Sequence, residues 1–413
     1  MFRRAVHELT NVGILAREGV TRAVRPDQAV RIGVAALRWG VSPATVAAAA
    51  AIQHGDRAAL VDERGALSFV ELDERSGALA AGLAAHDIGA GSRVAILCRN
   101  HRGFVDALLA LGKLGADALL LNTSSAGSRL VTVLANENAT AIIHDEEFGE
   151  VVEQVAIPRF VAWHDRPASA TTLDELIAGD YPAHLATSSR GGAVVILSAG
   201  KGAARAVPQS LDPVVGLVER IPLRRRRSHV VAAPLCQTWG LSFLLLGLQL
   251  GATQIFRRRF DPASVLLDLE AHRAEVLVPV PVLLERILEL PLESLRKHDL
   301  SSLEVVAAAG SALSGDLALE WMTQFGHTLY NIYGSTEAAL VSIATPEDLR
   351  AAPETAGRPA RGTVVKLLDD NGMEVPTGQT GRIFVANGGL VETGDTGHLD
   401  TNGRLFVQEP EVS

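Results

Sequence analysis

The sequence predicts an α/β fold with doubly wound, mostly parallel sheets, followed by a small antiparallel β unit. Short apolar runs alternate with helix-like segments between about residues 90 and 335. Near-continuous apolar strands separated by helices are typical of parallel sheets that are covered on both faces. From about residue 360 to 407, short alternating runs are separated by Asp-Asn-Gly, Thr-Gly and Asn-Gly turns. That second pattern favours an antiparallel meander or barrel.

The individual elements follow from apolar periodicity and from the glycines that interrupt it. A helix over 104–114 ends before Gly115, and 130–134 lies in a second helix. The charge-free stretch 230–256 has the length of a membrane span, but its Pro and Gly residues favour a buried strand, helix and strand. Strands are expected at 94–98, 118–121, 141–143, 194–197, 230–233, 253–256, 276–278, 303–308, 328–332, 364–368, 382–385 and 404–407.

Composition narrows the class of protein. A chain of 413 residues with 47% hydrophobic and 21% charged residues predicts a soluble, cytoplasmic protein of two or three units. A net charge of −9 argues against nucleic acid as a general partner. Cys98 and Cys236 are expected to be buried, reduced thiols without metal-binding spacing. The arginine runs 224–227 and 257–259 favour solvated loop ends over an anion site.

The first 45 residues are basic and have helical spacing of their apolar residues. They contain seven arginines against three acidic residues. Such a segment can be a helical extension packed on the body of the protein, which we favour. It can also be an amphipathic helix that lies on an anionic membrane surface.

The segment Tyr-Gly-Ser-Thr-Glu at 333–337, with Asp395 some sixty residues later, is the strongest functional signal. The ring of Tyr333 can stack on a purine, and Gly334 allows a close backbone approach. The hydroxyl of Thr336 can reach a phosphate, and Glu337 can hold a divalent metal. Asp395 can accept hydrogen bonds from both hydroxyls of a ribose. The alternative is a tight turn in front of a capped helix.

Four further segments extend this pattern. They are Ala-Pro-Leu-Cys-Gln-Thr-Trp-Gly-Leu at 233–241, Val-Pro-Val-Pro-Val-Leu-Leu at 278–284, Val-Ala-Ala-Ala-Gly-Ser-Ala-Leu at 306–313 and Glu-Thr-Ala-Gly-Arg-Pro at 354–359. With the 333–337 segment they make the chain resemble the adenylate-forming (AMP-binding) superfamily, and within it the fatty-acid–CoA ligases, from about residue 50 to 407. The resemblance implies the large N-terminal domain of that fold: two flavodoxin-like subdomains and a small β meander or barrel.

The resemblance also implies a division of the chain. Residues 1–45 would be the basic helical extension and 46–190 the first α/β subdomain. Residues 191–355 would form the second α/β subdomain, with the phosphate loop and the adenylate site. Residues 356–413 would form the β-rich subdomain, and the C-terminal lid domain would be absent.

The activity that this resemblance implies is ATP-dependent conversion of a fatty acid to acyl-AMP and then to acyl-CoA. ATP or AMP, Mg²⁺ and coenzyme A are the implied cofactors and co-substrates, with Glu337 as the metal ligand. Thr336, Glu337 and Arg205 would be catalytic, and Gln237, Trp239, Gly240 and Val280 would line the acyl tunnel. The nucleotide would be bound by Ser198, Gly200, Lys201, Gly202, Gly310, Ser311, Asn331, Tyr333, Gly334 and Asp395.

The sequence departs from the family pattern at several places. The phosphate loop lacks both threonines of the family motif, and Arg205 stands where the family has lysine. Gln237 replaces a histidine, the Gly-Tyr loop before Thr393 is missing, and the chain ends at Ser413 without the hinge and lid. These departures leave open a non-catalytic module that binds adenylate or acyl ligands. An adenylating enzyme for an aryl or amino acid is a third, weaker alternative.

Overall fold

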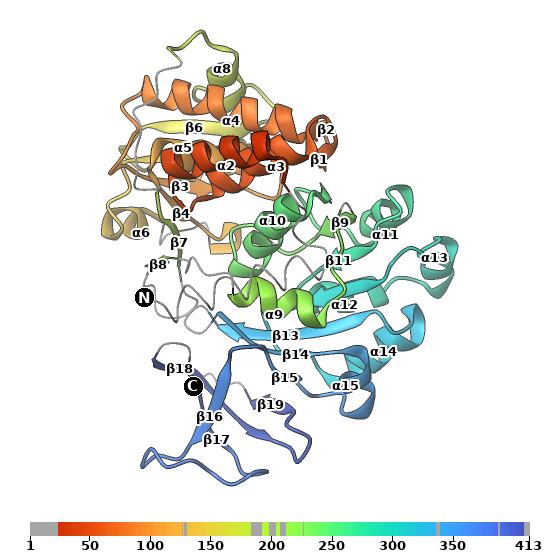
Figure 1. Cartoon of the computed structure of the whole chain (residues 1–413). Coiled ribbons are helices and arrows are strands. Elements are labelled where there is room, and N and C mark those ends of the chain that lie inside the picture. Colours follow the sequence, from red (N-terminus) through yellow and green to blue (C-terminus); the bar gives the residue numbers. More distant parts are fainter. Residues whose placement is uncertain are drawn as a thin grey trace. The chain divides into compact units, whose positions relative to one another are not determined.

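The computed structural model describes residues 24–125, 127, 130–182, 192–197, 204–206, 212–225, 227–335, 339–386 and 389–408. The chain divides into two compact units (Figure 1). We call the described residues within 23–209 and 234–259 the N-terminal unit, and those within 210–233 and 260–413 the C-terminal unit. The predicted α/β class is confirmed. The four-part division expected from the sequence stays a prediction.

The N-terminal unit contains a six-stranded sheet of order β6-β5-β3-β4-β7-β8, parallel except for β8. The strands are β3 (Arg93–Leu97), β4 (Asp117–Leu120), β5 (Ala141–Asp145), β6 (Arg159–Trp163), β7 (Val194–Leu197) and β8 (Ala204–Ala206). The helices that accompany them are α4 (Phe69–Ala84), α5 (Arg102–Leu114), α6 (Leu130–Asn136), α7 (Gly149–Val152) and α8 (Leu173–Ala178). As predicted, α5 ends at Gly115, whose φ of 68° is left-handed.

The same unit holds a second group of strands and three further helices. Strands β10 (Thr253–Ile255), β1 (Ala58–Asp62) and β2 (Gly65–Ser68) are neighbours in that order. Helix α10 (Thr238–Leu250) ends at the left-handed Gly251, so the stretch 230–256 contains a helix and a strand as predicted. Within the described ranges, no helix combines the length and the apolar character that crossing a membrane requires.

The N-terminal segment is helical where it is described. Helices α2 (Pro26–Trp39) and α3 (Pro43–His54) lie side by side (Figure 1), and the Gln28 side chain donates to the Ile52 carbonyl at 2.9 Å. Ala35 of α2 is buried. One face of α2 is therefore packed on the body of the unit, as the favoured interpretation requires. Residues 1–23 lie outside the described part.

The C-terminal unit contains strands in the order β15-β14-β13-β12-β11-β9. They are β9 (Ser228–Val231), β11 (Val276–Val278), β12 (Val305–Ala308), β13 (Leu329–Ser335), β14 (Ala339–Ala344) and β15 (Arg358–Pro359). Strands β9, β11, β12 and β13 are parallel, whereas β14 and β15 are antiparallel to their neighbours. The helices are α9 (Asp212–Arg220), α11 (Pro262–Ala271), α12 (Pro281–Leu288), α13 (Leu292–Lys297), α14 (Gly315–Phe325) and α15 (Pro346–Ala351).

Strand β14 corrects the alternative interpretation of the 333–337 segment. That alternative required a helix to begin there, but residues 339–344 form a strand that pairs antiparallel with β13. The alternation Leu-Val-Ser-Ile over 340–343 suits a strand, with Val341 and Ile343 fully buried. The capped-helix interpretation is therefore wrong.

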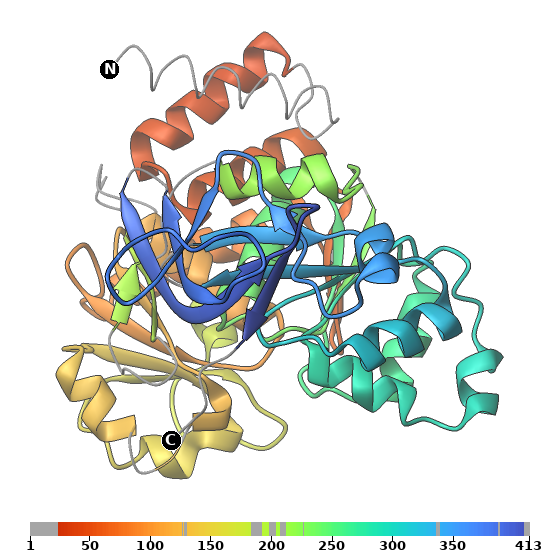
Figure 2. The same cartoon turned by 90° about the horizontal axis from the view of Figure 1, so that it is seen from below.

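The last part of the C-terminal unit is the predicted antiparallel meander. Strands β16 (Val364–Leu368), β17 (Gly381–Ala386), β18 (Leu390–Leu399) and β19 (Leu405–Gln408) pair in sequence order, and Figure 2 shows them as a curled sheet. The sequence did not predict β18, because its Glu-Thr-Gly-Asp-Thr-Gly run has low strand propensity. Its core combines Leu367, Ile383, Val385 and Leu405 with Val341 of β14, and Tyr333 packs against it.

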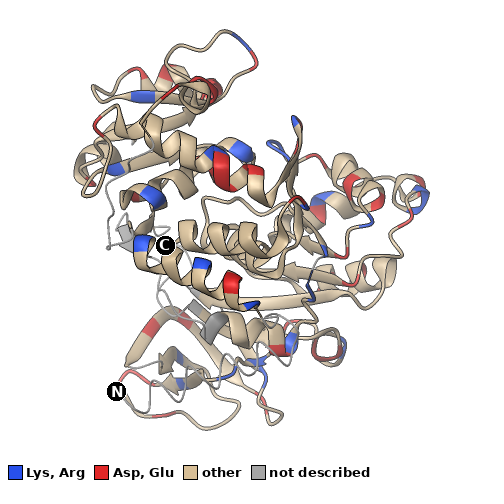
Figure 3. Ribbon diagram, turned by 45° about the horizontal axis from the view of Figure 1, so that its top comes forward, with Lys and Arg blue, Asp and Glu red and all other residues tan. Residues whose placement is uncertain are grey.

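Positive and negative side chains are interspersed along the ribbon (Figure 3), and the arginine runs participate in this pairing. Arg258 contacts Glu147 at 3.3 Å and Asp165 at 2.9 Å, and its side chain is only 14% exposed. Arg227 pairs with Glu304 at 2.7 Å and is 13% exposed. The prediction that the arginine runs are solvated loop ends is therefore wrong for Arg227 and Arg258. Each of these two residues is paired with acidic side chains that are distant in sequence.

Candidate functional site

Two residues assigned to the nucleotide, Gly310 and Tyr333, and one assigned to the acyl tunnel, Val280, lie at the carboxyl ends of parallel strands in the C-terminal unit. Val280 follows β11, Gly310 follows β12, and Tyr333 lies near the end of β13. Strands β11, β12 and β13 are consecutive neighbours in the sheet. Open α/β sheets bind ligands at this edge, where the loops leave the strands.

A short hydrogen bond joins the two strongest candidates. The hydroxyl of Tyr333 donates to an Asp395 carboxylate oxygen at 2.5 Å. Thr393 lies on the same strand, β18, and its hydroxyl accepts from the Asp395 backbone amide at 3.3 Å. Residues 62 positions apart in sequence are thus brought into contact by the packing of the meander against β13 and β14.

Burial and the Asp395 hydrogen bond both raise the pKa of the Tyr333 hydroxyl well above its ordinary value. The phenol therefore keeps its proton at neutral pH and remains a donor to the carboxylate. This donor holds Asp395 in one orientation before any ligand binds. A carboxylate held in this way suits the recognition of a pair of hydroxyls.

The backbone geometry at position 310 explains why this residue is a glycine. Its φ of +102° lies in the region that favours glycine, and a Cβ atom there would lie 3.2 Å from Cγ1 of Val280. Gly310 and Ser311 are exposed at the strand end. A larger side chain at this position would crowd Val280 and the edge of the sheet that carries Tyr333.

The side chain of Asn331 is hydrogen-bonded to the protein backbone. Its side-chain amide donates to the Thr355 carbonyl at 3.1 Å, and the residue is 7% exposed. The Thr355 hydroxyl in turn donates to the Leu405 carbonyl at 2.9 Å. These bonds fix the 354–359 turn between β13 and the meander. A direct contact of Asn331 with the nucleotide stays a prediction.

Several predicted residues cannot be placed. Ser198, Gly200, Lys201, Gly202, Thr336 and Glu337 lie outside the described residues. Arg205 lies on β8, opposite Ile196 of the antiparallel neighbour β7, and only its backbone is described. The phosphate loop is thus bounded by two paired strands. Gly334 is exposed on β13, one residue after Tyr333.

The residues assigned to the acyl tunnel, apart from Val280, lie in the N-terminal unit. Gln237 immediately precedes α10, and its own side chain makes no capping hydrogen bond. Trp239 packs edge-to-face on Phe243 at 4.8 Å between ring centroids, and Gly240 is buried in the same turn. The loop before α10 is held where the Leu235 backbone amide donates to Asn100 at 2.8 Å.

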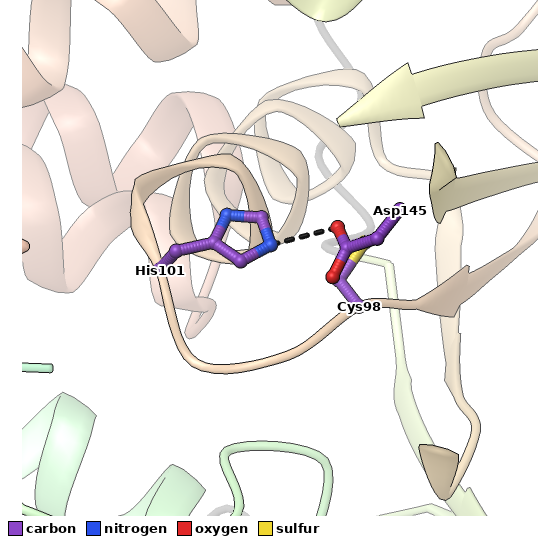
Figure 4. Close-up of side chains that lie close together, drawn as sticks. All are labelled: Cys98, His101 and Asp145. Carbon is purple, nitrogen blue, oxygen red and sulfur yellow. Dashed lines mark hydrogen bonds and ion pairs between the residues drawn. The ribbon is translucent and has the colours of Figure 1, made fainter. Parts of the chain in front are cut away.

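Cys98, His101 and Asp145 form a buried cluster that was not predicted from the sequence (Figure 4). His101 Nε2 lies 2.7 Å from Asp145 Oδ1, and its Nδ1 accepts the Gly103 amide at 3.0 Å. The other Asp145 oxygen accepts the Arg99 amide at 2.9 Å. The Cys-x-x-His spacing at 98–101 is the signal that could have indicated it.

This cluster is better suited to structure than to metal binding. The backbone donor fixes the tautomer of His101, so its Nε2–H donates to Asp145, and both ring nitrogens are in use. Burial, and then the charge of Asp145, raise the pKa of Cys98 well above its ordinary value, so sulfur stays a thiol. A metal requires the thiolate. The cluster ties the end of β3 to β5 and caps α5, and both cysteines are buried and free, as predicted.

Comparison with known proteins supports the resemblance to AMP-binding enzymes that the sequence indicates. The family model described as AMP-binding enzyme matches residues 47–393. A feruloyl-CoA synthase from an Amycolatopsis species is 30% identical over 345 residues, which cover 82% of this chain and 67% of the relative.

Two solved structures show the shared fold. The inhibitor-bound N-terminal domain of FACL13 from Mycobacterium tuberculosis has a TM-score of 0.78 and 19% identity, over 89% of this chain and 99% of that one. The o-succinylbenzoate CoA synthetase of Bacillus subtilis, in complex with its acyl-adenylate intermediate, has a TM-score of 0.74 and 23% identity, over 89% and 78%. With a family model matched over most of its length, this chain belongs to the AMP-binding enzyme family, among relatives that are acyl- and aryl-CoA ligases.

Proposed function

We propose that this chain is an AMP-forming fatty-acid–CoA ligase. ATP and coenzyme A are its co-substrates, and Glu337 would hold Mg²⁺, which would neutralise charge on the phosphates. The observation that supports the nucleotide site best is the Tyr333–Asp395 hydrogen bond at 2.5 Å, at the strand edge that also carries Gly310. In this proposal the protein acts in the cytoplasm.

The proposed chemistry depends on positioning more than on proton transfer. A carboxylate is already ionised at neutral pH, so it can attack the α-phosphorus of ATP without a strong general base. As the new oxygen–phosphorus bond forms, the bond between the α-phosphorus and the oxygen that bridges to the β-phosphate breaks, and pyrophosphate leaves with the electron pair. The ring of Tyr333 stacks on adenine, Asp395 accepts from the ribose hydroxyls, and Gly310 and Ser311 border the base. Thr336 donates to the α-phosphate. Arg205 neutralises phosphate charge near the Ser198–Gly202 loop.

Displacement of AMP by the coenzyme A thiol then completes the reaction. The sulfur forms a bond to the acyl carbon and the thiol proton passes to water, while the carbon–oxygen bond to AMP breaks, so that AMP leaves with the electron pair. The apolar surroundings of Gln237, Trp239, Gly240 and Val280 support an aliphatic acyl chain as the substrate.

An aromatic carboxylic acid is the second candidate substrate. The observation that favours it is the 30% identity to a feruloyl-CoA synthase. The ring of Trp239, which packs edge-to-face on the buried Phe243 at the start of α10, would offer a surface that suits either a flat or an aliphatic acyl group.

The deciding experiment measures pyrophosphate release and acyl-CoA formation with ATP, Mg²⁺ and coenzyme A. The panel contains fatty acids of increasing length, ferulate and 4-coumarate, with the Asp395→Ala variant as the background control. Turnover that is highest with a fatty acid supports the proposal. Turnover only with the aromatic acids would replace the substrate, and binding of AMP without any turnover would assign the chain to the non-catalytic class.

Replacing Tyr333 with phenylalanine separates the hydroxyl from the ring. The ring still stacks on adenine, but Asp395 loses its 2.5 Å donor, so we expect the Kd for AMP to rise about three- to tenfold. Tyr333→Ala should cost more, because stacking is lost as well. Isothermal titration calorimetry checks the order. A phenylalanine variant that binds AMP as weakly as the alanine variant would show that the ring does not stack.

The raised pKa of Tyr333 adds a test by pH. Because burial and Asp395 raise the pKa of the hydroxyl above the ordinary tyrosine value of about 10, the affinity for AMP should stay constant from about pH 9 to about pH 10.5, where an ordinary tyrosine would lose its proton. A loss of affinity across this range that is absent from Tyr333→Phe would mean that the hydroxyl ionises there.

A further inference from the structure

Helix α2 is apolar on two opposite faces, and among the residues that the structure describes only one of these faces is packed against the rest of the unit. The inner face carries Ile32 and the buried Ala35, and Gln28 of the same face bonds to α3. The outer face carries Val30, Val34 and Leu37, which are spaced four and three residues apart and so form one stripe along the helix.

The outer stripe is unusually exposed. Val30 is 67% exposed, Val34 58% and Leu37 82%. Single exposed apolar side chains are ordinary, but an aligned stripe on one helix face marks a surface that contacts something else. We call Val30, Val34 and Leu37 the α2 stripe.

The charges beside the α2 stripe indicate which kind of partner would contact it. Arg25, Arg31 and Arg38 lie on or next to α2, against a single acidic residue, Asp27. The chain as a whole carries a net charge of −9, so this segment has the opposite sign to the protein around it. A helix with an apolar stripe and flanking arginines matches the pattern of helices that lie in the interface of a lipid bilayer.

We propose that the α2 stripe binds the surface of an anionic lipid bilayer, with α2 parallel to the membrane plane. The valine and leucine side chains would enter the boundary between headgroups and acyl chains. The arginines, Arg31 foremost, would lie beside lipid phosphates. Apolar burial and charge attraction then act together, so that binding needs both. The proposal does not depend on the substrate or on turnover.

The test is sedimentation of the full chain with vesicles of phosphatidylcholine, alone or with 30% phosphatidylglycerol. We expect at least tenfold stronger partitioning to the anionic vesicles, and a marked loss of binding when salt is raised from 0.1 M to 0.5 M. Val34→Gln with Leu37→Gln should reduce partitioning at least tenfold. Arg31→Gln should reduce the preference for anionic lipid.

The matched control is Leu267→Gln on α11, which removes a 51% exposed leucine from another helix. It should leave binding unchanged, and all variants should unfold at the same temperature as the parent, because the replaced side chains are exposed. Equal binding by the Val34/Leu37 variant would overturn the proposal, as would equal binding to neutral and anionic vesicles. Absence of vesicle binding with a dimer that this variant abolishes would assign the stripe to a second copy of the chain instead.

Discussion

Replacing Asp395 with alanine is expected to raise the Kd for AMP by at least about a hundredfold. Two ribose hydroxyls donating to one carboxylate make two charge-assisted hydrogen bonds, worth about 1.5–3 kcal/mol each, and every 1.4 kcal/mol is tenfold in Kd. The Tyr333 hydroxyl already holds that carboxylate in place, so little reorganisation is needed on binding. Isothermal titration calorimetry with AMP measures the change.

The matched control is Glu392→Ala, which removes another carboxylate from β18. Glu392 pairs with Arg382 at 3.2 Å and is about half exposed, so its loss should leave AMP affinity within twofold. Arg205→Ala should also have a smaller effect than Asp395→Ala, since AMP lacks the β- and γ-phosphates near the proposed phosphate loop. A larger loss with Arg205→Ala would remove Asp395 from the ribose.

The largest expected effect on stability comes from a buried ion pair in the N-terminal unit. Arg102 donates through its backbone amide and through Nε and Nη2 to the carboxylate of Asp62, whose side chain is fully buried. The same guanidinium also donates to the Gly65 carbonyl at 2.7 Å. Asp62→Ala leaves this guanidinium buried without its counter-charge. We expect a loss of about 3–5 kcal/mol in the free energy of unfolding.

Urea unfolding measures that loss, and two further variants define its cause. Glu63→Ala removes the neighbouring exposed carboxylate, which accepts the Arg258 amide, and should cost less than about 1 kcal/mol. The double variant Asp62→Ala with Arg102→Met should regain much of the stability, because no uncompensated charge stays buried. A double variant less stable than Asp62→Ala alone would show that the pair itself stabilises the fold.

The same pair predicts how stability depends on pH. Burial raises the pKa of Asp62, but the hydrogen bonds and charge of Arg102 outweigh burial and leave it below its ordinary value. The unfolded carboxyl has a pKa of about 3.9, so the stabilisation is fully present above that value and is lost as pH falls through the lower folded pKa. Unfolding between pH 5 and 2 should therefore be less steep with pH in Asp62→Ala than in the parent. Equal slopes would mean that Asp62 does not contribute.

Most of the secondary structure could be predicted from the sequence, because parallel strands that are buried on both faces consist of uninterrupted runs of apolar residues. The strands at 94–98, 141–143 and 276–278 and the helix ending before Gly115 lie within about two residues of β3, β5, β11 and α5. Strand β14 was not among the predicted strands, although its Leu-Val-Ser-Ile run suits a strand. Strand β18 could not be predicted in the same way, because its Glu-Thr-Gly-Asp-Thr-Gly run has low strand propensity, and pairing with β17 and β19 on its two sides is what makes it a strand.

The chain by itself determined which residue types are available for nucleotide chemistry, since the 333–337 segment and Asp395 can be recognised from their side chains alone. Only the tertiary structure decided that Tyr333 donates to Asp395, that Asn331 fixes the 354–359 turn, and that Cys98 lies in a hydrogen-bonded cluster with His101 and Asp145. It also decided that the outer face of α2 stays exposed while its inner face is packed. The physical reason is that periodicity records local burial, whereas hydrogen-bond partners and exposed faces depend on which distant segments pack together.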